Sequence, residues 1–285
     1  MATSDLITPA PNTWCPGCGN FAIEHALKDV LTGMIDGGTP REEFVLVTGI
    51  GCHGKMADYL GINSFYAIHG RTIPVATGIA LANPDLRVIC CAGDGDCYGE
   101  GLEHLVFAAK RNVDITLIVH DNRVYGLTTG QYTPTSPLGF PGRSTPGGSP
   151  EYPLNPLALM VATGATFVAR GYSRRLPQLR LLIRDGLSHR GLSFLEILQV
   201  CASFFNQTSY YDEHAYDLDP SEFPTRDVDR AMRVAREWDY STDSRIPLGA
   251  LYRTRLPTYQ EHLAAHRAGT RDPASAIRGF LDERR

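Results

Sequence analysis

The chain has 285 residues, and its 27 lysine and arginine residues against 31 aspartate and glutamate residues give a formal net charge of -4. A balance this close to neutral gives no general reason to expect nucleic acid or an anionic membrane as a partner. The sequence contains no run of 18 apolar residues, and its first residues lack the basic and apolar regions of a secretion signal, so we expect a cytoplasmic protein.

Apolar runs that are typical of buried strands alternate along the chain with segments of helical spacing. The expected strands are 44–50, 86–92, 115–119, 165–169 and 194–197. The expected helices between them are 72–81, 98–110, 156–162 and 173–187. This alternation predicts an α/β fold, with a mostly parallel sheet and helices on both faces. In such a fold, ligands bind at the carboxyl ends of the strands.

Three regions are expected from this pattern. Residues 1–43 form an N-terminal segment with candidate metal ligands, residues 44–205 form the α/β domain, and residues 206–285 form an extension that packs on the core or on another subunit. Within the domain, residues 133–156 are rich in proline, glycine, serine and threonine and cannot be regular throughout. A long loop that follows a ligand site is more often a lid or an interface than a plain linker.

The first expected strand is followed by the segment GIGCHGKM, residues 49–56. It differs by one letter from the phosphate-binding pattern G-x-x-x-x-G-K-[ST], because Met56 stands where a magnesium-binding hydroxyl is required. A P-loop nucleotide hydrolase is therefore one alternative that these residues leave open.

The second expected strand is followed by Gly93-Asp-Gly-Asp96, and Asn122 follows the next strand, 28 positions after Asp94. That interval accommodates a turn, a crossover helix and a parallel strand, so both side chains would reach one crevice. Their oxygens suit a magnesium ion that keeps phosphate oxygens in its shell. Gly93 and Gly95 would let the backbone approach a diphosphate. An ordinary strand-to-helix turn is the alternative.

Seven cysteines without a secretion signal are not expected to form disulfides, because the cytosol keeps thiols reduced. Cys90 and Cys91 lie in an apolar strand, where core packing explains both, and Cys97 lies at a helix start. The four that remain are Cys15, Cys18, Cys52 and Cys201. Four thiolates suit a [4Fe-4S] cluster or a structural zinc ion, and spacing alone does not choose between the two metals.

Five motifs in order carry a resemblance to a known family. They are WCPGCGN at 14–20, GIGCHGK at 49–55, HGRTIPVATG at 69–78, GDGD at 93–96 and YGLTTGQ at 125–131. Over about residues 12–205, the chain resembles the β subunits of 2-oxoacid:ferredoxin oxidoreductases, which are thiamine-diphosphate enzymes. The last motif is more similar to the 2-oxoglutarate-type members than to the pyruvate type.

The resemblance implies a thiamine-diphosphate and magnesium site in residues 44–205. Magnesium would be held by the side chains of Asp94 and Asn122 and by the backbone carbonyl of Val124. The rest of the cofactor pocket is implied for Gly51, His53, His69, Gly93, Gly95, Asp96, Gly126, Leu127 and Thr128. Cys15, Cys18, Cys52 and Cys201 become ligands of a [4Fe-4S] cluster, because the reaction needs an electron acceptor and zinc has no redox role. The family often has proline before the last of these cysteines, where this chain has Val200.

Three residues are candidates for catalytic or substrate contacts: Lys55, His53 and Leu127. Lys55 would attract the distal carboxylate of a dicarboxylic 2-oxoacid, although a solvated surface lysine is the alternative. Leu127 stands where pyruvate-type members carry a polar residue, and it would widen the substrate end of the pocket or make it less polar. Both residues favour 2-oxoglutarate as the substrate.

The glutamate that activates thiamine diphosphate comes from the other subunit in this family, and no glutamate of this chain is assigned to that role. The resemblance therefore implies an enzyme that is active only with an α subunit, in an αβ or α2β2 assembly. Its other partners would be a 2-oxoacid, coenzyme A and ferredoxin, with no nucleic acid and no membrane. The alternatives left open are the same chemistry on pyruvate or a broad range of 2-oxoacids, a P-loop-like hydrolase and a zinc-stabilised structural subunit.

Overall fold

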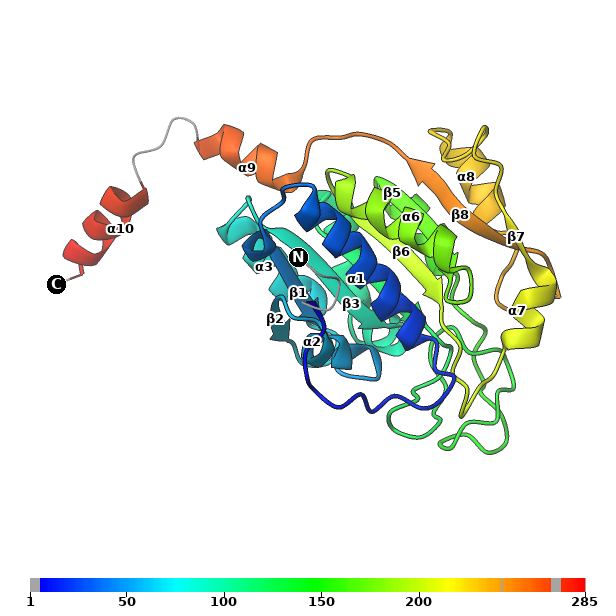
Figure 1. The fold of residues 1–285 in the computed structure, drawn as a ribbon. Helices are drawn as coiled ribbons and strands as arrows, with labels where there is room; N and C mark the ends of the chain where they lie inside the picture. The colour runs from blue at the N-terminus through cyan, green and yellow to red at the C-terminus, as the bar shows by residue number, and fades with distance from the viewer. Residues whose placement is uncertain (1–5, 242, 268–272, 285) are drawn as a thin grey trace.

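A computed structural model describes residues 6–241, 243–267 and 273–284 of the chain. Within these residues, eight strands form one sheet in the order β2-β1-β3-β4-β6-β5-β8-β7 (Figure 1). The strands are β1 (Phe44–Thr48), β2 (Asn63–Tyr66), β3 (Arg87–Gly93), β4 (Thr116–Asp121), β5 (Phe167–Tyr172), β6 (Ser193–Leu198), β7 (Ala215–Asp217) and β8 (Ile246–Arg253). Neighbouring strands pair in parallel, except β5 and β8, which pair antiparallel.

Helices cover both faces of the sheet, so the central strands are buried on both sides and are apolar for most of their length. On one face lie α1 (Asn20–Asp36) and α6 (Leu176–Ser188), side by side in Figure 1 and joined by an ion pair of 2.7 Å between Asp29 Oδ2 and Arg180 Nη2. The other face is covered by α3 (Thr72–Ala82), α4 (Leu102–Arg111), α5 (Pro156–Thr163) and α8 (Val228–Ala235).

Local sequence accounts for where these helices begin and end. Before α5, the Asn155 side chain accepts a hydrogen bond from the backbone N–H of Ala158, and Pro156 occupies the first helical position. The same helix stops at Gly164, which has a φ of 87°. α4 buries Leu105, Ala108 and Ala109, the i, i+3, i+4 spacing of a helix with one apolar stripe.

The remaining helices are shorter or lie near the C-terminus. They are α2 (Met56–Tyr59), α7 (Thr208–His214), α9 (Tyr259–Arg267) and α10 (Pro273–Asp282). A π-helical turn, Gly95–Glu100, precedes α4. In the described residues, no helix combines the length and the apolar character needed to cross a membrane.

The predicted α/β fold, with its mostly parallel sheet, is confirmed, and each of the five expected strands and four expected helices is present with shifted ends. The first strand stops at Thr48, so the extension to residue 50 was wrong. The expected helix 98–110 is divided, because the π-helical turn ends at Gly101 before α4 begins.

Two regions outside the expected domain also contribute to this core. Residues 1–43 contain α1, a helix of 17 residues that the sequence pattern had not indicated. Residues 206–285 supply β7, β8 and α8, and β8 pairs directly with β5. The sequence pattern had not indicated these two strands, 215–217 and 246–253.

Candidate functional site

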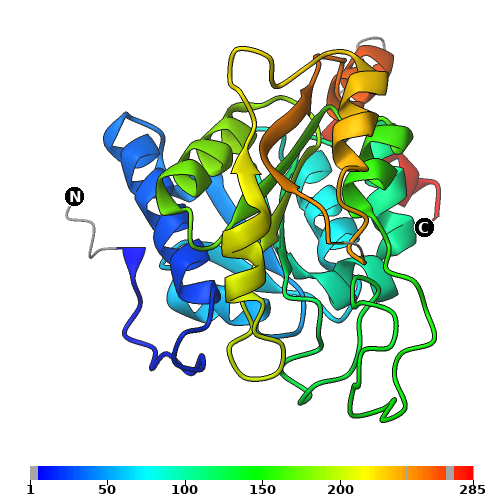
Figure 2. The same ribbon diagram turned by 90° about the vertical axis from the view of Figure 1, so that its right-hand side faces the viewer.

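The loops that follow β1, β3, β4 and β6 meet at the carboxyl edge of the sheet, because these four strands are adjacent and parallel. Figures 1 and 2 show the long loop after β4 and the loop after β6 at this same end, next to the segment that precedes α1. A cavity of about 80 Å³ lies between the loops. Its lining includes all twelve residues that the sequence assigned to the cofactor pocket: Gly51, His53, His69, Gly93, Asp94, Gly95, Asp96, Asn122, Val124, Gly126, Leu127 and Thr128. Ile50, Cys52 and Tyr125 complete it.

Two buried carboxylates, Asp94 in the lining of this cavity and Asp121 behind it, share the hydroxyl of Thr135. Thr135 Oγ1 lies 3.0 Å from Asp94 Oδ2 and 2.8 Å from Asp121 Oδ1, and it can donate to only one of them at a time. Burial raises the pKa of both carboxyls, and the charge of Asp94 raises the pKa of Asp121 further. Asp121 Oδ2 has no hydrogen-bond partner. Such a pair of close, buried carboxylates fits the binding of a divalent cation.

The side chain of Asn122 is held in one orientation from both sides. Its Oδ1 accepts a hydrogen bond of 3.1 Å from the backbone N–H of Val124, and its Nδ2 donates one of 2.8 Å to Gln199 Oε1. The turn between Asn122 and Val124 passes through Arg123, which has a positive φ of 60°. The amide oxygen therefore lies on the same side as Val124, the residue from which the resemblance implied a backbone ligand.

Close packing explains the glycines of the GDGD motif. A Cβ atom on Gly93 would lie 2.7 Å from His53 Nδ1, and one on Gly95 would lie 2.2 Å from Tyr125 Cε1. The sequence predicted that these glycines make room for a ligand. In the structure their immediate neighbours are two side chains of the cavity wall, so a larger residue would displace the wall itself.

Asp96 connects three loops of the site. Its Oδ1 accepts a hydrogen bond of 2.7 Å from the backbone N–H of Gly70, and its Oδ2 lies 3.4 Å from His53 Nε2. A Cβ atom on Gly49 would lie 1.9 Å from Asp96 Oδ2, so the loop after β1 also needs glycine at its closest approach. Asp96 is 3% exposed, which fits a residue that shapes the pocket from behind.

One compact group of possible cation ligands lies across this cavity. In the described part of the chain, it is formed by His69, Asp96 and Glu100, whose ligand atoms all lie within 4.8 Å of one another. His69 Nδ1 and Glu100 Oε2 form an ion-pair contact of 3.2 Å. His69 therefore reaches the cavity, as expected, while its ring is anchored to the π-helical turn.

A buried histidine next to His53, His120, was missed by the sequence patterns. His120, at the end of β4, is 1% exposed, and its Nδ1 lies 2.8 Å from Asn20 Oδ1. Its ring centroid is 6.1 Å from that of His53. Burial lowers the pKa of His120 well below its usual value, so this imidazole is neutral at physiological pH. Only its place next to Asp121-Asn122 could have drawn attention to it.

The four cysteines that the sequence singled out line a second cavity, of about 260 Å³. All four are free thiols. Burial raises the pKa of Cys18 to about 11, and the nearby thiols of Cys52, Cys201 and Cys15 add to the increase. A thiol whose charged form is disfavoured by its burial and by neighbouring thiols fits a site completed by a positively charged metal centre.

The two cavities share part of their walls. Cys52, Asn122, Gly126 and Leu127 line both. Gly126 lies close to two of the thiols, since a Cβ atom there would be 3.6 Å from Cys201 Sγ and 3.8 Å from Cys52 Sγ. The expected cofactor pocket and the expected metal ligands are therefore neighbours.

Lys55 lines the cysteine cavity and not the cofactor cavity. Its Nζ donates a hydrogen bond of 3.3 Å to the backbone carbonyl of Thr13. His53–Lys55 forms a short 3-10 turn that leads into the four residues of α2. Leu127 is 47% exposed at the boundary of the two cavities, where its side chain can meet a ligand or a partner chain.

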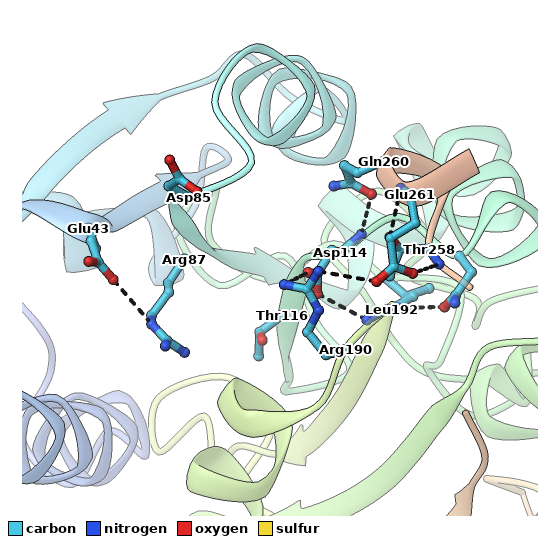
Figure 3. Close-up of polar contacts among 12 residues, drawn as sticks. Glu43, Asp85, Arg87, Asp114, Thr116, Arg190, Leu192, Thr258, Gln260 and Glu261 are labelled. Carbon is cyan, nitrogen blue, oxygen red and sulfur yellow. Dashed lines mark hydrogen bonds and ion pairs between the residues drawn. The ribbon is translucent and has the colours of Figure 1, made fainter. Parts of the chain in front are cut away.

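A third cavity, of about 540 Å³, lies at the opposite, amino edge of the sheet and is larger than either of the others. Figure 3 shows two ion pairs among its charged groups, while no dashed line reaches Asp85. Arg87 Nε lies 3.6 Å from Glu43 Oε2, and Arg190 Nη1 lies 3.0 Å from Asp114 Oδ2. The sequence predicted no site here, and these mutual pairings fit a structural role.

Comparisons with known proteins agree with this geometry. Residues 49–197 match the family model described as thiamine pyrophosphate enzyme, C-terminal TPP binding domain, and residues 201–268 match the model for the C-terminal part of the pyruvate ferredoxin oxidoreductase beta chain. The chain is 40% identical over 275 residues to the 2-oxoacid:ferredoxin oxidoreductase subunit beta of Sulfolobus sp, covering 91% of this chain and 88% of that protein. It is 42% identical over 197 residues to the 2-oxoglutarate oxidoreductase subunit KorB of Mycobacterium tuberculosis, covering 69% of this chain and 52% of that protein.

A solved structure is similar over nearly the whole chain. It is the 2-oxoglutarate:ferredoxin oxidoreductase from Magnetococcus marinus with 2-oxoglutarate, coenzyme A and succinyl-CoA bound. The TM-score is 0.89 at 34% sequence identity, and the match covers 97% of this chain and 95% of that chain.

Proposed function

The chain belongs to the β subunits of 2-oxoacid:ferredoxin oxidoreductases, and from this premise we propose that its substrate is 2-oxoglutarate. With an α subunit and coenzyme A, it would carry out oxidative decarboxylation of 2-oxoglutarate or the reverse carboxylation, with ferredoxin as the electron partner. The 2-oxoglutarate-specific names of several relatives support this substrate.

The observation that carries the proposal is the common wall of the two cavities at the carboxyl edge. The cavity proposed for thiamine diphosphate and the cavity lined by the four cysteines share Cys52, Asn122, Gly126 and Leu127. A cofactor that generates a reducing intermediate and a metal centre that accepts electrons must lie close together. A P-loop hydrolase needs no such pairing, and Lys55 lines only the cysteine cavity.

We assign magnesium to Asp94 and Asn122 through their side chains and to Val124 through its backbone carbonyl. The close carboxylates Asp94 and Asp121 and the fixed amide of Asn122 support this assignment. Thiamine diphosphate, when bound, supplies the nucleophilic carbon and the electron sink for decarboxylation. Asp96 holds the loops around its diphosphate in place, and His53 forms the wall behind Gly93.

The spread of the cysteine sulfurs supports a [4Fe-4S] cluster over zinc. A tetrahedral zinc ion, with Zn–S bonds of about 2.3 Å, draws its sulfurs to about 3.8 Å from one another. The thiolates of a cluster bind separate iron atoms and lie farther apart. Among the described residues, the group of possible ligand atoms that lie within 4.8 Å of one another, His69, Asp96 and Glu100, contains none of the sulfurs of Cys15, Cys18, Cys52 and Cys201.

The substrate would approach where the two cavities meet. Lys55 is the cation that lines the cysteine cavity, and Leu127, which lines both cavities, forms the apolar side of their boundary. A dicarboxylic 2-oxoacid could place its distal carboxylate near Lys55, which the hydrogen bond to Thr13 holds at the mouth of the cysteine cavity. Pyruvate, which lacks that carboxylate, is the competing substrate. The family model that matches residues 201–268 is named after pyruvate ferredoxin oxidoreductase.

The α subunit would complete the site. Four apolar or aromatic side chains remain exposed here: Ile50 and Leu127, which line the cofactor cavity, and Tyr66 and Ile68, which lie on and just after the edge strand β2. A partner that covers them could also supply the carboxylate that activates the thiamine ring. We propose an αβ or α2β2 assembly, with residues 44–205 as the cofactor domain and residues 1–43 and 206–285 as its flanking regions.

The test is an anaerobic preparation of this chain co-expressed with its α subunit. We expect brown protein that contains iron and sulfide and reduces a viologen dye when both coenzyme A and 2-oxoglutarate are present. Faster turnover with pyruvate would overturn the substrate assignment. A colourless zinc protein, or nucleotide hydrolysis without dye reduction, would overturn the proposed chemistry.

A further inference from the structure

Gln199 lies between the loop of Asn122 and the loop of Cys18, and nothing in the proposed function yet uses it. It is the first residue after β6, and it is 2% exposed. Its backbone N–H donates a hydrogen bond of 2.8 Å to the carbonyl of Asp121, so the ladder between β4 and β6 continues to this point. The backbone thus places the side chain of Gln199 in the wall of the cysteine cavity, against Asn122 of the wall that the two cavities share.

The two ends of the Gln199 amide face different sites. Its Oε1 accepts a hydrogen bond of 2.8 Å from Asn122 Nδ2. Its Nε2 donates to Cys18 Sγ at 3.5 Å and also donates to the backbone carbonyl of Val200. These hydrogen bonds form one continuous chain. The Asn122 amide donates to Gln199 through Nδ2, and its Oδ1 is the atom proposed to bind magnesium.

The loop of Cys18 is seated firmly against this side chain. A Cβ atom on Gly19 would lie 3.1 Å from Gln199 Cγ and 2.8 Å from Val200 N, so only glycine fits the approach. The backbone N–H of Gly19 also donates a hydrogen bond of 3.0 Å to the carbonyl of Val200. The contact between Gln199 and Cys18 is therefore set by backbone packing on both sides.

We propose that Gln199 is a positioning residue that couples the proposed magnesium site to the proposed cluster through its side-chain amide. It fixes the orientation of Asn122, and it donates an N–H···S hydrogen bond to Cys18. The inference rests on the proposed function, because it requires a magnesium ion at Asn122 and a cluster at Cys18.

Two consequences follow from the direction of these hydrogen bonds. A donor to a ligating sulfur stabilises the additional electron of a reduced cluster, so Gln199 raises the reduction potential. A cation at Asn122 Oδ1 polarises Asn122 Nδ2 and, through it, the amide of Gln199, which strengthens the bond to sulfur. Binding of magnesium and thiamine diphosphate then raises the potential of the cluster when the cofactor is ready for reaction.

The experiment uses the anaerobic αβ holoenzyme and the substitution Gln199→Met, which keeps an unbranched chain of similar length without the amide. The cluster is titrated by EPR at defined potentials, with and without magnesium and thiamine diphosphate. We expect the variant to have a more negative midpoint potential, a smaller shift on cofactor addition, and a binding of thiamine diphosphate weakened by about 10-fold or more. The matched control is Gln178→Met, since Gln178 donates its amide to Asp217 on another side of the molecule and should leave all three readouts unchanged.

A measurement on the unsubstituted holoenzyme keeps the inference testable even if Gln199→Met fails to assemble a cluster. Labelling with glutamine that carries ¹⁵N in its side chain should produce a ¹⁵N hyperfine coupling in the pulsed EPR spectrum of the reduced cluster. An absent coupling, or an unchanged midpoint potential in a variant with full iron content, would overturn the role of Gln199 and leave the proposed function standing. A holoenzyme with no cluster signal at all would instead reject the proposed function, and the inference with it.

Discussion

The two ends of the sheet carry cavities of opposite character. At the amino edge, the larger cavity, of about 540 Å³, is lined by charges that pair with one another, Arg87 with Glu43 and Arg190 with Asp114. At the carboxyl edge, the cavity of about 80 Å³ is lined by His53, whose buried Nε2 has only an ion-pair contact of 3.4 Å with Asp96 Oδ2. Two buried atoms without a hydrogen-bond partner lie next to its lining residues, His120 Nε2 beside His53 and Asp121 Oδ2 beside Asp94. In the described residues, no such unpartnered side-chain atom belongs to the larger cavity. Volume is thus a poorer guide to the working site than unsatisfied polarity.

The physical reason is the cost of burying polar groups. A carboxylate or imidazole that is withdrawn from water without a partner costs free energy, so folding alone does not explain why the carboxyl edge retains several of them. Ligands that bind there would supply the missing partners. The lining of the amino-edge cavity has no such unpartnered atoms among the described residues. We therefore expect substitutions at the carboxyl edge to lower activity and substitutions at the amino edge to change stability alone.

The largest expected effect is that of Asp94→Asn. Loss of a magnesium ligand should lower 2-oxoacid-dependent dye reduction by more than about 100-fold, because even residues behind a metal ligand can contribute 10–100-fold. The same change removes one of two neighbouring buried carboxylates, so the cofactor-free protein should melt at a higher temperature. Activity assays of the αβ enzyme and thermal unfolding of the cofactor-free chain measure the two effects.

The matched substitution at the amino edge is Asp114→Asn. It weakens the ion pair with Arg190 and the hydrogen bond of 2.9 Å from the backbone N–H of Gly191. We expect unchanged turnover and a loss of about 1 kcal/mol in the free energy of unfolding, measured with urea. A large fall in activity here would show that the amino edge is also functional, and it would contradict the structural role assigned to the larger cavity.

The next effect concerns two cysteines with different surroundings. Cys52→Ser should abolish most of the absorbance near 400 nm and the iron content, because the residue is a proposed cluster ligand. Cys90→Ser, at a fully buried position in β3, should keep the colour and cost about 1–3 kcal/mol of stability. Equal loss of iron in both variants would contradict the assignment of Cys52.

A smaller effect is expected for Lys55→Ala. If Lys55 binds the distal carboxylate of the substrate, its removal should raise the KM for 2-oxoglutarate by about 10-fold. This is the loss of affinity expected when one charge-assisted hydrogen bond is removed. The KM for pyruvate should hardly change. Lys110→Ala, on the surface of α4, is the control for the loss of a lysine charge. An equal rise for both substrates would show that Lys55 does not read the distal carboxylate.

The smallest effect is the pH dependence of stability from His189, which lines the larger cavity. Burial, and then the charges of Arg253 and Arg255, lower the pKa of His189 to about 4. The unfolded chain takes up this proton near pH 6.5 and the folded chain only near pH 4. Stability is therefore fully present above pH 6.5 and is lost as the pH falls from 6.5 towards 4.

His189→Gln should make the fall in stability over this pH range less steep, since the group that protonates only on unfolding is gone. Urea unfolding at several pH values measures the slope. A slope as steep in His189→Gln as in the unsubstituted chain would assign the effect to other groups.

Much of the candidate site could be predicted from sequence because its residues stand at the ends of strands. The glycines and acids of residues 93–96 begin at the last residue of β3, and Asn122 follows β4, so parallel pairing brings them to one edge. The residues that were missed act through neighbours remote in sequence. Thr135 reaches Asp94 across 41 positions, and Asn20 reaches His120 across 100. No local pattern marks such partners, because they are chosen by packing.

The sequence by itself determined the fold class, the cofactor motif and the four cysteines, since periodicity and motif spacing are properties of neighbouring residues. The tertiary structure decided how these parts meet. It placed the cysteine cavity against the cofactor cavity, directed Lys55 towards Thr13, and set Gln199 between Asn122 and Cys18. These relations depend on the order of strands in the sheet and on the close approach of loops, which contacts between distant residues establish.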